Sequence, residues 1–344
     1  MQAALNTFMR QQLLDRRHRL EHATAHSEDQ IHLHMLLEEV DGALARIENG
    51  SFGICESCHE SIEPDRLLCD PLARICLGHL SRQERDALER DLQLAAEVQK
   101  GLLPRQSFEL DGWHICYHYE PAGLVSGDYC DVIDAGKAGL YFMVGDVSGK
   151  GMAASMLMAH LHAMFRTLIS VHLPLADMLK HASRVFSEST LPSQYATLVC
   201  GRAKPDGTVE ISNAGHPPPL LIHDGHVTRF EQSDLPVGLF ASEQFSVTEL
   251  RFEPGDGIVI YSDGVSDTLD PSGAEYSMER LQNVVHRRGR ADAPALVSAC
   301  REDLTAFRAH ARKMDDVTLF VLGRQLSPED RPEIDSVPEL VYTS

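Results

Sequence analysis

Two close pairs of metal-binding side chains lie between residues 55 and 79. Cys55 and Cys58 form a Cys-x2-Cys pair, and Cys76 and His79 repeat that spacing after 17 intervening residues. Four soft ligands in two such pairs are typical of tetrahedral zinc, which requires both pairs to meet around one ion. We therefore predict one structural Zn²⁺. Cys69, between the pairs, is a rival ligand with a less suitable spacing, and a small core of unliganded side chains is the alternative.

The segments on either side of this cluster have helical patterns. Apolar residues recur three and four apart over residues 33–47, and further apolar positions over residues 5–20 suggest an earlier helix. We predict a helical hairpin that joins the cluster in a first domain, residues 1–80. An amphipathic helix is expected within residues 81–104. Because its apolar stripe needs a partner, it is predicted to be a linker and a candidate homodimer contact.

The pattern changes near residue 105. Short apolar or alternating segments, punctuated by Gly, Pro and Asp, predict strands that are interspersed with helices. The predicted strands are 114–119, 140–144, 196–201, 208–212, 258–261 and 317–322, and the predicted helices are 152–170, 175–190, 277–287 and 293–312. These elements predict an α+β domain over residues 105–324, large enough for its own core. The acidic, Pro-containing residues 325–344 are predicted to be a disordered tail.

Composition restricts the classes of partner and location. The chain has 31 Lys and Arg against 51 Asp and Glu, a net charge of −20, which argues against a nucleic-acid partner held through its phosphates. No run of about 20 apolar residues is present, so no membrane association through a spanning helix is expected. Eight cysteines in 344 residues are too few for a disulfide scaffold, so we expect a reducing, cytoplasmic location.

Four aspartates of the larger domain lie in turns rich in Gly or Asp. They are Asp128, Asp146, Asp263 and Asp315, and three of them follow or precede a predicted strand. Gathered carboxylates without a counter-charge repel one another, and divalent cations with oxygen ligands relieve this repulsion. For any one aspartate alone, ordinary turn chemistry is the simpler interpretation.

Two families of known proteins share motifs with this chain. Residues 43–58, together with Pro71-Leu-Ala-Arg-Ile-Cys76, resemble the DksA/TraR zinc-finger family. This resemblance implies the helical hairpin, and members of that family can enter the RNA polymerase secondary channel through acidic residues at the hairpin tip. The tip here, residues 22–29, lacks the family's Asp-x-x-Asp-x-Ala pattern, which argues against polymerase binding.

Six ordered motifs over residues 88–324 resemble the SpoIIE/RsbU branch of the PPM metal-dependent protein phosphatases. They are Leu94-Ala-Ala-Glu-Val-Gln-Lys-Gly-Leu-Leu-Pro104, Gly127-Asp-Tyr, Gly145-Asp-Val-Ser-Gly-Lys-Gly151, Asn213-Ala-Gly-His-Pro-Pro218, Tyr261-Ser-Asp-Gly-Val265 and Asp315-Asp-Val-Thr318. The resemblance implies a PPM β-sandwich, two antiparallel sheets with helices outside and a two-metal site at one end.

Position by position, the resemblance implies that Asp146 bridges two Mn²⁺ or Mg²⁺ ions and that the Val147 carbonyl joins one of them. Asp263 and Asp315 hold the other ion, and Asp128 contributes directly or through water. Further candidate roles are support of these ligands by Asp131 and Asp316, attraction of phosphate by Lys150, and shaping of the cleft by Asn213 and His216; turn, solvent or structural roles are the alternatives.

These resemblances imply a protein serine/threonine phosphatase that is regulated through its zinc finger. The implied substrate is a phosphorylated STAS-domain anti-sigma-factor antagonist, also called an anti-anti-sigma factor, in a partner-switching pathway that controls a sigma factor. The alternative is an RNA-polymerase-binding or scaffold protein with a non-catalytic phosphatase domain. A third hypothesis is a redox sensor that uses the cysteines of the finger.

Overall fold

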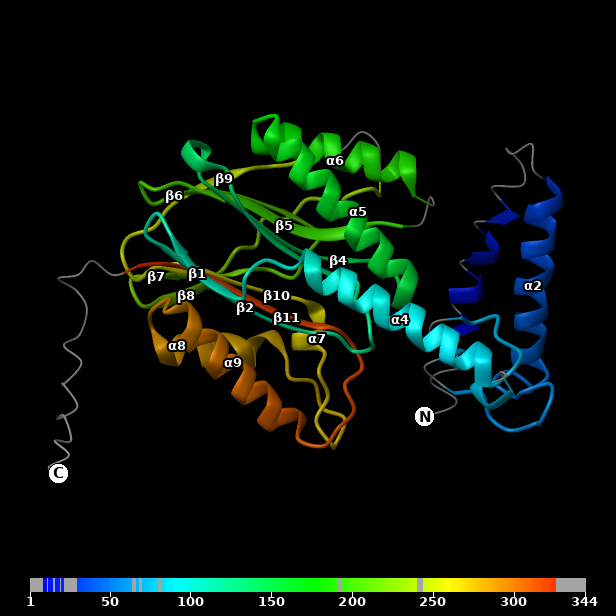
Figure 1. Ribbon diagram of the computed structural model, residues 1–344. Coiled ribbons are helices and arrows are strands. Elements are labelled where there is room, and N and C mark those ends of the chain that lie inside the picture. Colours follow the sequence, from blue (N-terminus) through cyan, green and yellow to red (C-terminus); the bar gives the residue numbers. More distant parts are fainter. Residues whose placement is uncertain are drawn as a thin grey trace, which may run out of the picture.

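The computed structural model describes residues 9–10, 12–14, 16–18, 20–21, 30–63, 66–67, 70–79, 82–190, 194–239 and 244–325. Its larger part consists of two stacked antiparallel sheets between two layers of helices (Figure 1). The five-stranded sheet has the order β3 (Asp128–Asp134), β4 (Leu140–Val147), β5 (Ala196–Ala203), β6 (Thr208–Ala214) and β9 (Thr248–Arg251). The six-stranded sheet has the order β1 (Ser107–Leu110), β2 (Trp113–Glu120), β11 (Val317–Arg324), β10 (Gly257–Tyr261), β7 (Leu220–His223) and β8 (His226–Arg229).

Apolar side chains from both sheets form the central core. Phe142 of β4 stacks on Phe320 of β11 with ring centroids 6.0 Å apart, and all residues of β10 are buried. The helices α5 (Gly151–Ser170) and α6 (Leu175–Ser189) cover the five-stranded sheet, while α8 (Met278–Arg288) and α9 (Ala293–Arg308) cover the six-stranded sheet. The predicted sandwich flanked by helices is confirmed.

The observed elements include all six predicted strands and all four predicted helices of this domain, with small differences at their ends. One difference matters for function. The predicted strand 140–144 continues to Val147, so Asp146 lies within β4 and not in the turn after it. The strands β1, β3, β7, β8 and β9 and the short helices η2 (Gly136–Ala138) and α7 (Asp263–Ser266) were not predicted.

The N-terminal residues form a separate core. Helix α2 (Gln30–Glu48) lies beside the helical residues described between 9 and 21, and Met9 and Leu13 are buried in one cluster with Val40. This arrangement agrees with the predicted helical hairpin. The hairpin tip, residues 22–29, and the predicted tail beyond residue 325 lie outside the described residues.

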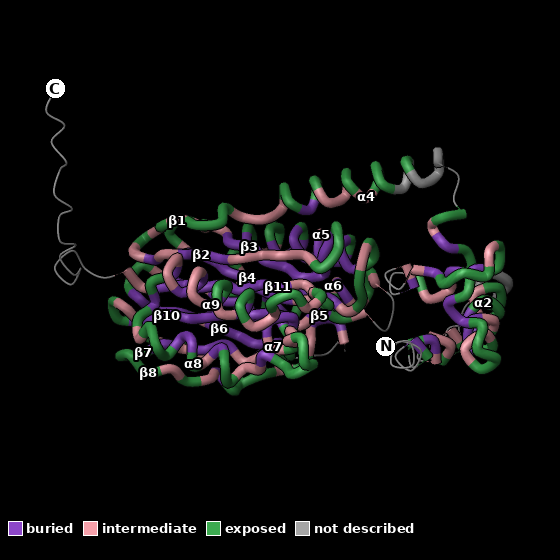
Figure 2. Tube along the Cα trace, turned by 90° about the horizontal axis from the view of Figure 1, so that it is seen from below, coloured by how far each residue is buried: buried purple, intermediate pink, exposed green. Residues whose placement is uncertain are grey.

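Helix α4 (Arg82–Leu102) connects the two parts of the chain. Its last residues pack against the sandwich, whereas its earlier residues extend away from it and are largely exposed (Figure 2). Within the described ranges, no helix combines the length and apolar character that crossing a membrane requires.

Candidate metal centres

Two of the predicted ligands face the same side of the five-stranded sheet. Asp128, the first residue of β3, pairs through its Cα with Asp146 of the antiparallel neighbour β4. The buried Asp128 carboxylate accepts a hydrogen bond from the Thr318 hydroxyl, and the Asp128 N–H donates to Ser126 Oγ at 3.0 Å. Directly opposed residues of antiparallel strands project to one face, so both carboxylates lie at the same end of the sandwich.

The other two predicted ligands come from the six-stranded sheet. Asp263 begins α7 just after β10, and Asp315 lies two residues before β11. These strands are antiparallel neighbours, so the end of β10 lies beside the start of β11. Two hydrogen bonds join them there, from Ser262 N to the Thr318 carbonyl at 3.0 Å and from Thr318 N to Ser262 Oγ at 2.9 Å. Each sheet therefore supplies two aspartates.

The charges of these aspartates act on one another. Burial, with the charges of Asp146 and Asp316, raises the pKa of Asp128 well above its ordinary value. Burial, with the charges of Asp263, Asp315 and Asp316, raises the pKa of Asp146 to about 8. Desolvation and the charge of Asp315 also raise the pKa of Asp263. Such mutual repulsion is expected where carboxylates gather to hold cations.

Two glycines allow the backbone to approach these ligands closely. A Cβ at Gly127 would lie 2.9 Å from Asp146 Oδ1 and 3.3 Å from the carbonyl oxygen of Val147. A Cβ at Gly264 would overlap the carbonyl oxygen of Asp316. The carboxylate of Asp146 and the carbonyl of Val147, both predicted ligands, thus face the same narrow space beside Gly127.

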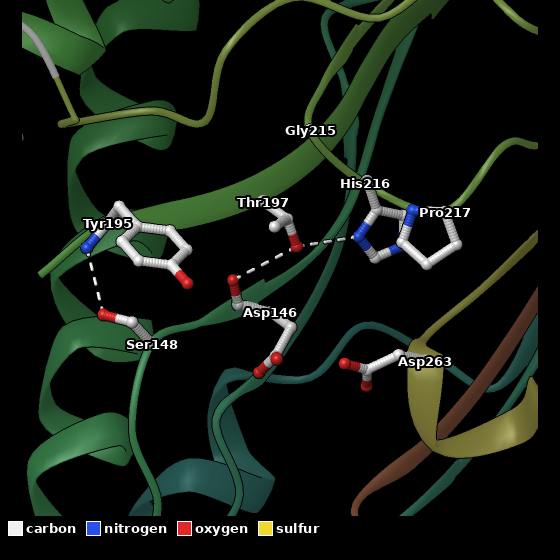
Figure 3. A pocket seen from close by; sticks show the side chains of 8 residues that line it. All are labelled: Asp146, Ser148, Tyr195, Thr197, Gly215, His216, Pro217 and Asp263. Carbon is white, nitrogen blue, oxygen red and sulfur yellow. Dashed lines mark hydrogen bonds between the residues drawn. The ribbon is translucent and has the colours of Figure 1, made fainter. Parts of the chain in front are cut away.

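A cavity of about 390 Å³ opens beside Asp146 and Asp263 (Figure 3). The Thr197 hydroxyl donates to the Asp146 carbonyl at 3.4 Å and lies 3.0 Å from Nδ1 of His216. Burial lowers the pKa of His216 to about 3, so its imidazole is neutral near pH 7. The remaining lining residues are Ser148, Tyr195, Gly215 and Pro217.

The donor set fits hard divalent cations, which prefer carboxylate and carbonyl oxygens. Among the described residues, no three acidic or His side chains of this site have ligand atoms all within 4.8 Å of one another. The carboxylates would therefore have to draw closer together around a bound ion. In the same described part of the chain, no cationic side chain forms an ion pair with Asp128, Asp146 or Asp263.

Asp316 and Asp131, which were predicted from the sequence to support the metal ligands, lie in different places. Asp316 accepts hydrogen bonds from the N–H groups of Ala122 at 2.6 Å and Gly127 at 2.9 Å, so it holds the loop before Asp128. Asp131 lies away from the cavity, because it points to α5, where Arg166 donates to both of its oxygens at 2.8 and 3.0 Å. In the structure Asp131 therefore anchors α5 and does not support the proposed ligands.

Two hydrogen bonds close the turn after β6, and this turn also borders the cavity. Asn213 Nδ2 donates to the His216 carbonyl at 3.0 Å, and His216 N donates to Asn213 Oδ1 at 2.9 Å. Sequence reasoning did not single out Thr318, Ser126 or Thr197. Thr318 belongs to the last of the six motifs, so a signal for it was present, whereas nothing in the local pattern marks the other two.

The Cys/His cluster forms a second candidate metal centre. The ligand atoms of Cys55, Cys58, Cys76 and His79 all lie within 4.8 Å of one another. Cys58 Sγ is 3.7 Å from Cys76 Sγ, and Cys76 Sγ is 3.3 Å from His79 Nδ1. Tetrahedral zinc with bonds of about 2.3 Å places two sulfurs about 3.8 Å apart. The four side chains fit one such ion, and the rival Cys69 lies outside the described residues.

Backbone turns bring these ligands together. Gly53 has a φ of 78°, the Cys55 N–H donates to the Glu60 carbonyl at 2.8 Å, and the Cys76 N–H donates to Cys55 Sγ at 3.3 Å. Although desolvation opposes the shift, N–H groups of Cys76, Cys58 and Ser57 lower the pKa of the Cys55 thiol to about 6. The thiolate is the form that binds metal.

The larger part of the chain is similar to known proteins. The family model described as Stage II sporulation protein E (SpoIIE) matches residues 136–325. Protein IcfG of Synechocystis sp. is 24% identical over 275 residues, 71% of this chain and 43% of IcfG. Phosphoserine phosphatase RsbU of Bacillus subtilis is 25% identical over 273 residues, 75% of this chain and 79% of RsbU. The chain thus spans less than half the length of IcfG.

A solved structure has the same fold. The crystal structure of the RsbU and RsbW domains of Rv1364c from Mycobacterium tuberculosis superposes with a TM-score of 0.55 and 26% sequence identity. The superposition covers 66% of this chain and 63% of that chain.

Proposed function

The chain belongs to the SpoIIE family, and on that premise we propose that it is a metal-dependent protein serine/threonine phosphatase. The observation that carries the proposal is that Asp128 and Asp146 from one sheet and Asp263 and Asp315 from the other are close enough for their charges to interact. Asp146 and Asp263 also line one cavity. The name of RsbU, a phosphoserine phosphatase, supports the same reaction.

The proposed ligands are those expected from the motifs. Asp146 would be shared by two Mn²⁺ or Mg²⁺ ions, with the Val147 carbonyl on one of them, Asp263 and Asp315 on the other, and Asp128 contributing directly or through water. When bound, the two ions would supply a water of lowered pKa and positive charge for the phosphoryl oxygens.

The chain's own residues would hold this arrangement. Thr318 fixes the Asp128 carboxylate, Asp316 holds the loop before it, and Thr197 holds the Asp146 carbonyl. Because water is the attacking group in such hydrolysis, no nucleophilic side chain is required. The cavity beside Asp146 would receive the phosphorylated residue of the substrate.

Asp146→Asn and Asp263→Asn test the proposed reaction. Each is expected to abolish Mn²⁺-dependent hydrolysis of p-nitrophenyl phosphate and of a phosphoprotein, because each removes a charged ligand. Circular dichroism would show that the variants remain folded, and Asp134→Asn, an exposed change at the far end of β3, should keep its activity. Retained turnover in both ligand variants would contradict the assignment.

The proposed substrate is a phosphorylated STAS-domain anti-sigma-factor antagonist in the cytoplasm, within a partner-switching pathway. Its support is the motif resemblance and the named activity of RsbU. Purification of the folded Asp146→Asn protein from cell extract, followed by identification of the phosphoprotein that stays bound, tests the substrate. Capture of RNA polymerase without any phosphatase activity in the wild type would favour the scaffold alternative.

We also propose that α4 carries regulation from the zinc finger to the aspartates. Gln99 of α4 is buried; its Nε2 donates to the Ser126 carbonyl at 2.7 Å, and its Oε1 accepts from Ser126 N at 2.9 Å. Ser126 in turn accepts a hydrogen bond from the Asp128 N–H. A shift of α4 would therefore move the loop before a proposed ligand. Exposed Leu94 and Val98 on α4 support a homodimer through this helix.

A further inference from the structure

A lysine contacts one of the four proposed aspartate ligands. Lys150 Nζ donates to Asp315 Oδ2 at 2.7 Å and to the Met314 carbonyl at 3.2 Å. Lys150 precedes α5 and has an extended backbone between Gly149 and Gly151, whose φ angles are 107° and 71°. Lys150 forms an ion pair with Asp315. Among the described residues, the other three proposed aspartate ligands form no ion pair.

The charge of Lys150 reaches beyond its direct partner. It lowers the pKa of both Asp146 and Asp263, against the larger effects of burial and of the neighbouring carboxylates. The ammonium thus offsets part of the repulsion among these carboxylates. The side chains of Lys150 and Asp315 are 42% and 41% exposed, so solvent reaches the pair and the lysine can leave it without crossing the core.

We propose that Lys150 is an internal counter-cation of the metal-free site, which leaves Asp315 when a divalent ion binds there. This rests on the proposed function, because it takes Asp315 as a metal ligand. An Asp315 oxygen that accepts from an ammonium is less available to an ion, and the ammonium repels a divalent cation a few ångströms away. Lys150 therefore stabilises the metal-free protein and competes with the metal.

The test measures metal binding and not turnover. Lys150→Met keeps the length of the side chain and removes its charge, whereas Lys150→Arg keeps the charge. Full-length, zinc-loaded proteins would be titrated with Mn²⁺, with free Mn²⁺ followed by electron paramagnetic resonance. We expect Lys150→Met to bind Mn²⁺ roughly threefold to tenfold more tightly than the wild type. We also expect it to melt at a lower temperature without Mn²⁺.

Controls separate local charge from net charge and from shape. Lys137→Met, an exposed change in η2 at the other end of the β3–β4 hairpin, should leave Mn²⁺ affinity unchanged. Lys150→Arg should bind Mn²⁺ as the wild type does. Unchanged or weaker Mn²⁺ binding by Lys150→Met than by the wild type would overturn the proposal while leaving the ligand assignment intact. So would binding by Lys150→Arg that is as tight as that by Lys150→Met. If the wild type and Lys150→Met both fail to bind Mn²⁺, the assignment of the aspartates fails with it.

Discussion

The raised pKa of Asp146 makes the metal-free protein sensitive to pH. In the folded chain this pKa is about 8, against an ordinary value of 3.8 for an aspartate. Between these values the folded state binds more protons than the unfolded state, so the free energy of unfolding falls as pH rises. The stabilising contribution of protonated Asp146 is complete below about pH 4 and is lost as pH passes through about 8.

Asp146→Asn should remove this part of the pH dependence. Between pH 5.5 and 8.5, without Mn²⁺, we expect the melting temperature of the wild type to fall by several degrees more than that of the variant. In a domain of this size 1 kcal/mol corresponds to roughly 2–4 °C. Calorimetry of the zinc-loaded proteins would measure it, with Asp134→Asn as the matched control. Parallel curves for the wild type and Asp146→Asn would show that Asp146 does not titrate in this range.

At the residue scale, the sequence predicts ligands better than it predicts the groups that hold them. The aspartates stand in recognisable motifs, and two of them, Asp146 and Asp263, line one cavity. The partner of Asp128 is Thr318, 190 residues away, and that of Ser126 is Gln99, 27 residues earlier. Such pairings depend on which strands and helices become neighbours, which no local pattern contains.

At the scale of single elements, the buried face of α4 includes a polar residue. Gln99 is a polar residue buried on that helix, and it satisfies both backbone groups of Ser126. Gln99→Met keeps the shape and removes both hydrogen bonds, and each buried group left unpaired costs about 1–3 kcal/mol. We expect Mn²⁺ affinity and turnover each to fall about tenfold, because the loop before Asp128 would shift.

A matched variant on the same helix controls for this change. Gln93→Met replaces an exposed glutamine of α4 and should behave as the wild type in Mn²⁺ titration and in phosphatase assays. If Gln99→Met also matches the wild type in both measurements, α4 does not position the loop, and the proposed route of regulation is wrong.

Strands were predicted where several apolar residues follow one another, and five other strands were not predicted. β3 contains three aspartates in seven residues and therefore does not resemble a buried strand. Its burial is tolerated because the Thr318 hydroxyl donates to Asp128 and Arg166 donates to Asp131. The strands β1, β7, β8 and β9 are four residues long and partly exposed, so their patterns are too short to predict.

At the scale of the whole molecule, the N-terminal region with the predicted zinc finger and the sandwich have separate cores. The apolar cluster of the N-terminal region contains no described residue after Cys76, and the three apolar clusters of the sandwich contain none before Leu102. Cys58→Ser should reduce zinc content and open the finger to protease, since small zinc modules fold with their metal. We expect the sandwich of this variant to resist protease as it does in the wild type.

Zinc analysis and mass spectrometry of the protease fragments would measure these effects, with Ser57→Ala, an exposed neighbour, as the control. Altered Mn²⁺-dependent turnover in Cys58→Ser would support regulation through the finger, and unchanged turnover would count against it. Loss of the sandwich together with the finger would show that the two cores are not independent.

The division of the aspartates between the two sheets has a consequence for the proposed metal site. Any small sliding of one layer over the other changes the spacing between the Asp128–Asp146 pair and the Asp263–Asp315 pair. A change in how the two sheets pack, even one made far from the cavity, would therefore act on the proposed metal site.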